Sequence, residues 1–336
     1  MKFAIVGCGF IAKKHATAIT NIQGAKLVAV CDKVDTAMEY YSTNYHVKTY
    51  NDFSEMISNE DIDIVCICTP SGFHSKLAVE AANAGKHIIV EKPIAMTLVD
   101  SNEIIEAARK NNIKLSVVHP NRFRPVVLEL KAILDSGILG TFSHANCIVN
   151  WNRDQEYYNQ AAWRGTKQFD GGVLMNQAIH NLDLLLWFMG KPIEVFSMEA
   201  TRLRQIEAED VSVGVVRFES GAIASIQSST TVYPKNLEES ITIFGEFGTI
   251  KIGGTNALFF EHLQVEGLSE EQITNLKEKV EKDPWGTPGH QWILEDMIHA
   301  IRENREPQVT GDDGENVLKF VLSLYESAHK KVLIKY

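Results

Sequence analysis

A glycine-rich turn near the start of the chain has the residue types that hold a dinucleotide pyrophosphate. Gly7, Gly9 and Ala12 fit the pattern G-x-G-x-x-G/A, with Phe10 and Ile11 between them, directly after a short apolar run. The first glycine permits a tight turn, the second lets the backbone approach a phosphate, and the small third residue lets the following helix pack on the strand. The amino terminus of that helix would face the phosphates. An ordinary glycine-rich turn is the alternative that the pattern alone leaves open.

An acidic residue stands where a dinucleotide site needs one. Asp32 ends the next apolar run, about 20 residues after the turn, and a carboxylate there can accept hydrogen bonds from an adenosine ribose. It would also repel a 2′-phosphate, which favours NAD over NADP, although the neighbouring Lys33 weakens that preference. An ordinary carboxylate at a strand end or helix cap is the alternative. The two motifs together predict an NAD site.

Two further segments follow apolar runs at the point where parallel strands place ligands. Thr69, Pro70 and His74 follow one run, and Glu91-Lys92-Pro93 follows the next. A lysine at that edge would direct its ammonium into the ligand crevice, and the proline can lock the chain sharply as a cis peptide. A strand exit with a helix cap explains the first segment equally well, and a surface position remains open for Lys92.

A long helix expected over 173–188 carries a polar stripe on an otherwise apolar surface. Asn176, His180 and Asp183 are spaced i, i+4, i+7 and would share one face. Asp183 and His180 could simply satisfy one another in the core. In the functional interpretation, His180 accepts a proton with a pKa near the working pH. We expect no metal site, because H-x-x-D supplies only two ligands and no further ligand motif accompanies it.

These motifs need a scaffold that brings strand ends to one edge, and the first 120 residues predict one. Apolar runs alternate with helix-length stretches, which indicates parallel β-α-β units in a doubly wound α/β sheet. The runs are continuous because both faces of such a sheet are covered. We expect strands at 2–6, 27–30, 62–68, 87–90 and 114–118, and helices at 13–21, 36–45, 75–84 and 98–111.

After residue 120 the pattern changes to strands joined by tight turns, which predicts an α+β domain with a large, mostly antiparallel sheet. We expect strands at 142–149, 195–202, 211–218, 222–231, 239–244 and 249–252, and helices at 126–136, 173–188, 290–302 and 315–331. The predicted domains therefore cover 1–120 and 121–336, with the C-terminal helices able to pack back on the first domain.

Composition and charge exclude several classes of protein. With 45% apolar and 23% charged residues over 336 positions, the chain lies in the globular range rather than the disordered or fibrous one. The 43 acidic against 33 basic side chains give a charge of −10, which argues against a broad nucleic-acid-binding face. No apolar run approaches the roughly 18 residues that cross a bilayer. Five cysteines, an odd number, fit buried thiols in a reducing compartment. We therefore expect a soluble cytoplasmic protein without a nucleic-acid or membrane partner.

The motifs taken together resemble the glucose–fructose oxidoreductase / inositol dehydrogenase family (Gfo/Idh/MocA). The resemblance runs along essentially the whole chain, and it is carried by the loop 7–12, Thr69-Pro70 with His74, Glu91-Lys92-Pro93 and the helix with His180. It implies an NAD-binding Rossmann domain followed by an α+β domain with an open sheet face. It also implies a homo-oligomer, either a dimer or a tetramer.

The resemblance assigns roles to particular residues. By position, Lys92 is similar to the family's catalytic lysine and His180 to its catalytic histidine, and Glu91 belongs with Lys92 to the cofactor segment. Many members place an aspartate four residues before that histidine, where this chain has Asn176. An amide cannot take a proton, so Asn176 would orient a substrate hydroxyl rather than join a full proton relay.

A narrower resemblance concerns the substrate. Four segments are similar to the branch that oxidises UDP-N-acetylglucosaminuronic acid at C3 for bacterial surface polysaccharides, namely 150–158, 163–166, 170–177 and 233–238. The carboxylate of that substrate calls for a planar bidentate donor, and Arg164 is the first candidate. Tyr157, Thr166 and Gln177 would bind sugar hydroxyls or the acetamido group. A salt bridge from Arg164 to Asp170 is the alternative that remains open.

Other interpretations also remain open. Lys235 and Asn236 would contact the diphosphate or uracil, or would only form a turn after Pro234. An enzyme of a free polyol or simple sugar, such as inositol or glucose, is the alternative within the family. A non-catalytic NAD-binding regulator is an alternative from another class. The sequence leaves the recycling of reduced NAD, the direction of the reaction and the number of subunits undetermined.

Overall fold

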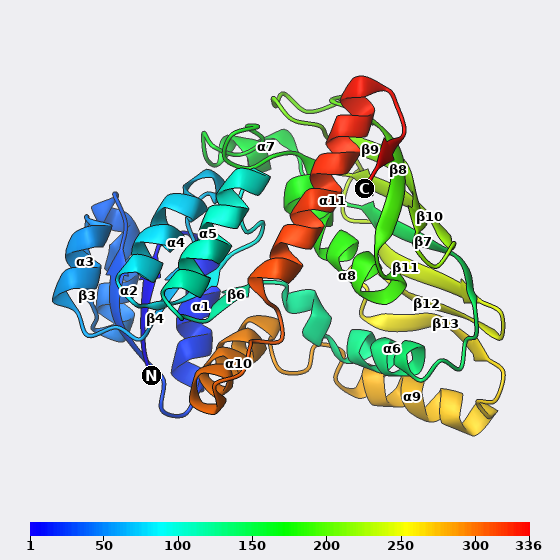
Figure 1. The fold of residues 1–336 in the computed structure, drawn as a ribbon, viewed down its shortest axis with the longest axis horizontal. Coiled ribbons are helices and arrows are strands. Elements are labelled where there is room, and N and C mark those ends of the chain that lie inside the picture. Colours follow the sequence, from blue (N-terminus) through cyan, green and yellow to red (C-terminus); the bar gives the residue numbers. More distant parts are fainter. The chain divides into compact units, whose positions relative to one another are not determined.

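A computed structural model describes all residues from Met1 to Tyr336, and the chain divides into two compact units (Figure 1). Unit 1 comprises Met1–Pro120 with Pro288–Leu318, and unit 2 comprises Asn121–Thr287 with Lys319–Tyr336. The first boundary lies at the residue where the sequence pattern changes. The prediction drew the second domain as 121–336, whereas the structure assigns 288–318 to unit 1. No helix is both long enough and apolar enough to cross a membrane.

Unit 1 is built on a six-stranded parallel sheet in the order β3-β2-β1-β4-β5-β6. The strands are β1 (Lys2–Val6), β2 (Lys26–Cys31), β3 (Lys48–Tyr50), β4 (Ile64–Ile67), β5 (His87–Val90) and β6 (Leu115–Val117). The helices include α1 (Phe10–Asn21), α2 (Asp35–Tyr45), α3 (Phe53–Asn59), α4 (His74–Asn83), α5 (Leu98–Lys110) and α10 (Gly289–Glu303). The doubly wound sheet is therefore confirmed. Strand order reverses between β1 and β4, the kind of position at which such sheets bind ligands.

The central strands of unit 1 are buried on both faces, as their apolar runs predict. Every residue of β4 is buried, and helices α1 and α4 pack against the central strands β1, β4 and β5. Helix α10 packs against α1, although the two helices are far apart in the sequence. The remaining long helix, α11 (Gly311–Lys330), begins in unit 1 and continues into unit 2.

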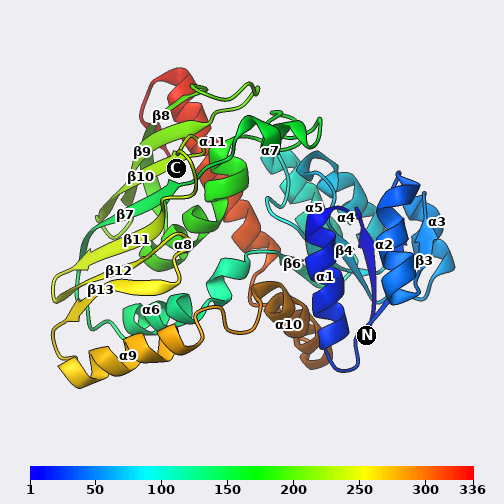
Figure 2. The ribbon, with the colours of Figure 1, turned by 180° about the vertical axis from the view of Figure 1, so that it is seen from behind.

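Unit 2 contains an eight-stranded sheet in the order β13-β12-β11-β7-β10-β9-β8-β14 (Figure 2). The strands are β7 (Phe142–Asn150), β8 (Pro192–Ala200), β9 (Val211–Phe218), β10 (Ile223–Ser229), β11 (Glu238–Gly245), β12 (Gly248–Gly253), β13 (Phe259–Val265) and β14 (Ile334–Lys335). The helices are α6 (Pro125–Asp135), α7 (Gln155–Asn159), α8 (Ile179–Met189) and α9 (Glu270–Lys282). Only β10 and β7 pair in parallel, so the prediction of a mostly antiparallel sheet is confirmed.

The helix expected over 173–188 is two structures in sequence. Val173–Ala178 form a π-helix, a rare form often found at functional sites, and α8 continues from Ile179. The backbone hydrogen bonds of a π-helix run from i to i+5, so Asn176 and His180 lie in segments of different helical winding. Farther along, Asp183 forms a bidentate ion pair with Arg122, through hydrogen bonds of 2.8 and 2.6 Å. Asp183 is therefore bound by a residue from outside its own helix.

Candidate functional site

The glycine turn after β1 has the geometry that a pyrophosphate requires. Gly7 has φ +88°, and a Cβ there would lie 2.6 Å from the backbone nitrogen of Thr69, so only glycine fits. Around Gly9 there is open space, and as the residue before α1 it makes no side-chain cap. The first N–H groups of α1 are therefore available to an anion. Phe10 and Ile11 are the first residues of α1, and the Phe10 ring is 75% exposed.

Asp32 ties this turn to the end of β2. Its Oδ2 accepts from the backbone N–H of Cys8 at 2.7 Å and its Oδ1 from that of Val34 at 2.9 Å. The carboxylate is thereby oriented by the backbone, with lone pairs left over for ribose hydroxyls. Lys33, the basic neighbour, donates to the carbonyl of Asn51 at 2.8 Å. The uncapped helix and the oriented carboxylate together fit NAD.

The exits of β4 and β5 are joined by His74. This fully buried ring has Nδ1 2.9 Å from the Pro93 carbonyl oxygen and Nε2 3.0 Å from that of Thr69. Burial lowers the pKa of His74, and the two carbonyl contacts oppose that shift. His74 therefore holds the two strand exits together through their backbones. Pro70 continues the first exit, and direct cofactor contact by these residues stays a prediction.

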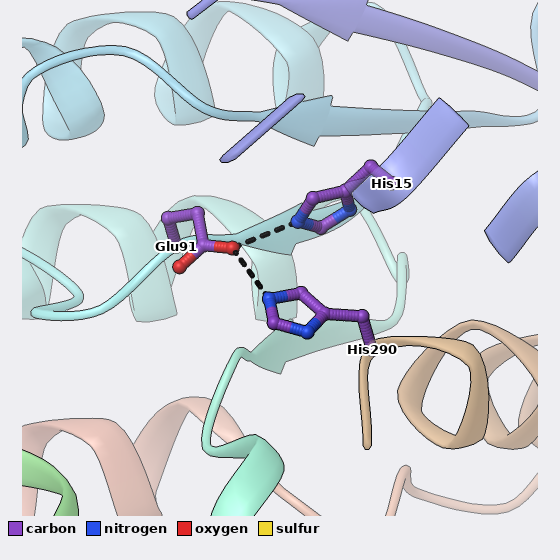
Figure 3. Close-up of side chains that lie close together, drawn as sticks. All are labelled: His15, Glu91 and His290. Atoms are coloured by element: carbon purple, nitrogen blue, oxygen red, sulfur yellow. Dashed lines mark hydrogen bonds and ion pairs between the residues drawn. The ribbon is translucent and has the colours of Figure 1, made fainter. Parts of the chain in front are cut away.

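Glu91 and Lys92 follow β5 and have different environments. The peptide between Lys92 and Pro93 is cis, as expected. Lys92 is half-buried, whereas the Glu91 carboxylate is buried. It is hydrogen-bonded to His15 and within ion-pair distance of His290, both in unit 1 (Figure 3). Nothing in the sequence pattern indicated that these two histidines would meet Glu91.

In unit 2 the structure brings together three of the expected substrate residues. The Arg164 guanidinium lies 4.2 Å from the centre of the Tyr157 ring, whose hydroxyl accepts from Gln177 at 3.1 Å. Arg153, which sequence reasoning did not single out, donates to Gln177 at 3.1 Å and lies 5.4 Å from the Tyr157 ring. The result is a cluster of two guanidiniums on aromatic and amide groups. Such a cluster can bind an anionic or polyhydroxylated ligand.

The Asp170 carboxylate binds a backbone N–H and a side-chain amide of unit 2. Its carboxylate accepts from the backbone N–H of Gly165 at 2.6 Å and from the side-chain amide of Asn176. These two bonds engage both carboxylate oxygens of Asp170. Asn176 is thus oriented by an acid six residues before it in the chain. The Thr166 hydroxyl donates to the Trp163 carbonyl at 2.7 Å, which leaves only its oxygen lone pairs for a ligand.

The turn after Pro234 is a structural element. The Asn236 side-chain oxygen accepts from the backbone of Asn152 at 3.0 Å and from Arg153 at 3.3 Å. These bonds support the interpretation of Asn236 as a turn residue. Its position next to Arg153 nevertheless links the turn to the guanidinium cluster.

Sequence reasoning also missed Glu209, a buried acid that contacts the π-helix. Glu209 accepts from the Leu174 backbone at 2.9 Å and from the Tyr325 hydroxyl at 3.0 Å, and burial raises its pKa to about 8. Its carboxyl holds the first turn of the π-helix that precedes His180. No local signal could have found it, because its partners are far away in sequence. All the expected cofactor residues thus belong to unit 1, and His180 and the expected substrate residues belong to unit 2.

Comparisons with known proteins agree with this architecture. The family model described as "Oxidoreductase family, NAD-binding Rossmann fold" matches residues 1–119, and that described as "GFO/IDH/MocA C-terminal domain" matches 127–251. Among relatives, the myo-inositol 2-dehydrogenase of Thermotoga maritima is 25% identical, with 100% of this chain and 98% of the relative covered. An uncharacterised oxidoreductase of Bacillus subtilis, YrbE, is 28% identical over 92% of this chain and 89% of its own.

Two solved structures are more similar still. The WlbA dehydrogenase from Bordetella pertussis, in complex with NADH and UDP-GlcNAcA, has a TM-score of 0.95 and 33% identity, with 100% of this chain and 97% of that chain covered. The WlbA dehydrogenase from Chromobacterium violaceum, with the same two ligands, has a TM-score of 0.95 and 34% identity, with 100% and 96% covered. The chain therefore belongs to the GFO/IDH/MocA family of oxidoreductases and carries its NAD-binding Rossmann domain.

Proposed function

We propose that this enzyme oxidises the C3 hydroxyl of UDP-N-acetylglucosaminuronic acid to the 3-keto sugar, with NAD as the cofactor. The observation that carries the proposal is the cluster of Arg153 and Arg164 on Tyr157 and Gln177 in unit 2. A uronate and a diphosphate supply the negative charges that two guanidiniums bind, whereas a neutral polyol supplies none. The similarity to the two WlbA dehydrogenases along the whole chain supports the same substrate.

In the proposed mechanism, His180 accepts the proton of the C3 hydroxyl. Lys92 donates a hydrogen bond to the same oxygen and stabilises the negative charge that develops on it. Asn176, oriented by Asp170, holds a neighbouring hydroxyl without exchanging protons. The turn around Gly7 and the Asp32 carboxylate would hold NAD, which when bound supplies the acceptor for the hydride that leaves C3.

The substrate is tested by a single-turnover assay of the purified protein with NAD. UDP-N-acetylglucosaminuronic acid, the neutral UDP-N-acetylglucosamine and myo-inositol are compared by absorbance of reduced nicotinamide and by mass of the sugar. We expect the uronate alone to become lighter by two hydrogens. Turnover of inositol with an inert uronate would replace the substrate while keeping family and cofactor. The proposed reaction would serve cytoplasmic synthesis of sugars for bacterial surface polysaccharides.

Replacing Arg164 tests how the carboxylate is recognised. Arg164→Ala should weaken binding of the uronate by about 10- to 100-fold, because a charge-assisted hydrogen bond is lost. Binding of the neutral UDP-N-acetylglucosamine should change little. Isothermal titration of both nucleotides, with the exposed Arg302→Ala as control, measures the difference. An equal loss for both nucleotides would mean that Arg164 only supports Tyr157 and does not recognise the carboxylate.

We also propose that a second copy of the chain covers one face of the sheet in unit 2. On that face, Met198 pairs with Val213 and Phe196 with Val215, and all four side chains are exposed, Met198 by 71%. Contiguous apolar surface of this kind marks an interface. At its margin Glu194 and Arg217 form an ion pair, so the patch offers both charges to an identical partner.

The assembly is expected to depend on that face. Val213→Glu should convert the oligomer to a smaller species in sedimentation velocity, because two buried carboxylates would face the partner's apolar side chains. Val99→Glu, at a 70% exposed position of α5, is the matched control and should leave the assembly unchanged. A wild-type protein that sediments as a monomer at micromolar concentration would contradict the proposal.

A further inference from the structure

Three ionisable side chains from separate parts of the sequence meet inside unit 1 (Figure 3). His15 comes from α1, Glu91 from the exit of β5, and His290 from the first turn of α10. His15 is fully buried, and the side chains of Glu91 and His290 are 8% and 12% exposed. The same carboxylate oxygen, Oε1, lies 2.8 Å from Nε2 of His15 and 3.5 Å from Nε2 of His290.

The two imidazoles allow the Glu91 carboxylate to remain ionised in the interior. Burial by itself raises the pKa of a carboxyl, but the hydrogen bonds from His15 and His290 outweigh it and hold the Glu91 pKa well below its usual range. Burial lowers the pKa of His290, which favours its neutral form. A buried anion that lost these donors would be strongly unfavourable. The three side chains are therefore held to one another.

A metal ion is the other chemistry that two imidazoles and a carboxylate could support. The three ligand atoms lie within 4.8 Å of one another, and a His₂Glu set is known for zinc. A metal-bound imidazole, however, donates its second ring N–H to an acceptor. The Nδ1 of His15 is buried and has no hydrogen-bond partner, so the acceptor that would orient a metal-bound ring is missing there. The geometry favours a hydrogen-bonded network.

The network lies next to Lys92 in the chain. The backbone N–H of Glu91 donates to the Ile67 carbonyl at 3.0 Å, and its side chain is bound by the two histidines. On the other side of Lys92, the Pro93 carbonyl is bound by His74 at 2.9 Å. Lys92 therefore stands between two anchored residues. Its backbone position depends on contacts that its own side chain does not make.

We propose that His15 and His290 are positioning residues for Lys92, which act through the carboxylate of Glu91. This inference rests on the catalytic role proposed above for Lys92. Because α10 belongs to the segment that returns to unit 1 from far along the sequence, the loop that carries Lys92 is completed only when this segment packs on α1. Neither histidine needs to touch NAD or the sugar.

The test compares three substitutions in α10. His290→Leu removes the donor, His290→Gln supplies an amide N–H near the position of Nε2, and His299→Leu alters a 57% exposed histidine of the same helix. We expect His290→Leu to lower kcat by about 10- to 100-fold, as small misplacements of catalytic groups do. His290→Gln should recover most of that loss, and His299→Leu should behave as wild type. The affinity for NAD, measured by fluorescence titration, should change far less than kcat.

A second measurement follows the chemical accessibility of Lys92 and does not depend on catalytic activity. Trace acetylation by acetic anhydride, followed by mass spectrometry of the Lys92 peptide, should proceed at least about threefold faster in His290→Leu, because a released loop opens more often. In the Lys92→Ala background, His290→Leu should cause no further loss of kcat, since both act through one group. Additive losses together with unchanged labelling of Lys92 would overturn the inference.

Two other outcomes distinguish this inference from the catalytic role of Lys92 and from a metal site. If Lys92→Ala retained wild-type turnover, the catalytic role of Lys92 would fail, whereas labelling would still report whether the network positions the loop. If elemental analysis of the purified protein found one zinc per chain that His290→Leu removed, a metal site would replace the network. His290→Gln keeps the comparison informative if His290→Leu does not fold.

Discussion

Replacing His180 by asparagine should lower kcat by about 10²- to 10⁴-fold, the range in which a general base contributes. Asparagine retains a polar group of similar size but cannot accept a proton. NAD affinity should be nearly unchanged, because His180 belongs to unit 2 and the glycine turn and Asp32 belong to unit 1. Steady-state kinetics with the uronate and fluorescence titration of NAD measure the two quantities.

The pH dependence of kcat tests whether His180 acts as a general base. If His180 is the base, kcat of the wild type should fall at low pH, where a protonated His180 cannot accept the substrate's proton. In His180→Asn this fall in kcat should disappear. His262→Asn, at an exposed position of β13, is a matched control. A variant that kept the wild-type profile and kcat would rule out His180 as the base.

Replacing Lys92 by alanine is the second large effect we expect. Lys92→Ala should lower kcat by about 10²- to 10³-fold, because a preorganised donor to the developing oxyanion is lost. The exposed Lys110→Ala in α5 removes a lysine from the same unit and should have no effect. Single-turnover absorbance of reduced nicotinamide measures the chemical step directly. An unchanged rate in Lys92→Ala would show that the ammonium does not act on the reacting oxygen.

The two variants also separate an enzyme from a regulator. If the wild type binds NAD but oxidises none of the three sugars, the non-catalytic interpretation gains support. If the wild type turns over and both variants lose kcat, the pair acts in catalysis. A double variant that loses no more than the worse single variant would show that Lys92 and His180 act in one step.

Local sequence signals predicted most of the elements, and their failures have a physical cause. The strand Lys48–Tyr50 was missed because it is a short edge strand without a buried residue, so it shows no apolar run. The helix Glu270–Lys282 was missed because it buries only Val280. The helix over 173–188 was expected to be continuous because a π-helical segment has no periodicity signal distinct from that of an α-helix.

Some residues of the candidate site could likewise be predicted from the sequence, and others could not. The glycine turn, Asp32 and Lys92 could be found from the sequence because each lies directly after a strand, and parallel strands all end at one edge of the sheet. Arg153 and Glu209 could not be found, since their partners come from distant segments. The role of Asp170 was open because a carboxylate can pair with any nearby donor, and only packing selects the backbone of Gly165 and the amide of Asn176.

The sequence by itself determined the doubly wound sheet of unit 1, the mostly antiparallel sheet of unit 2 and the NAD motif. These depend on the side-chain pattern within a few residues, which decides local conformation and burial. Only the tertiary structure decided that His15 and His290 both contact one carboxylate oxygen of Glu91. It also decided that residues 288–318 complete unit 1. His15 and Glu91 are 76 residues apart. Contacts of that separation follow from how whole elements pack, and no local pattern encodes which side chains then meet.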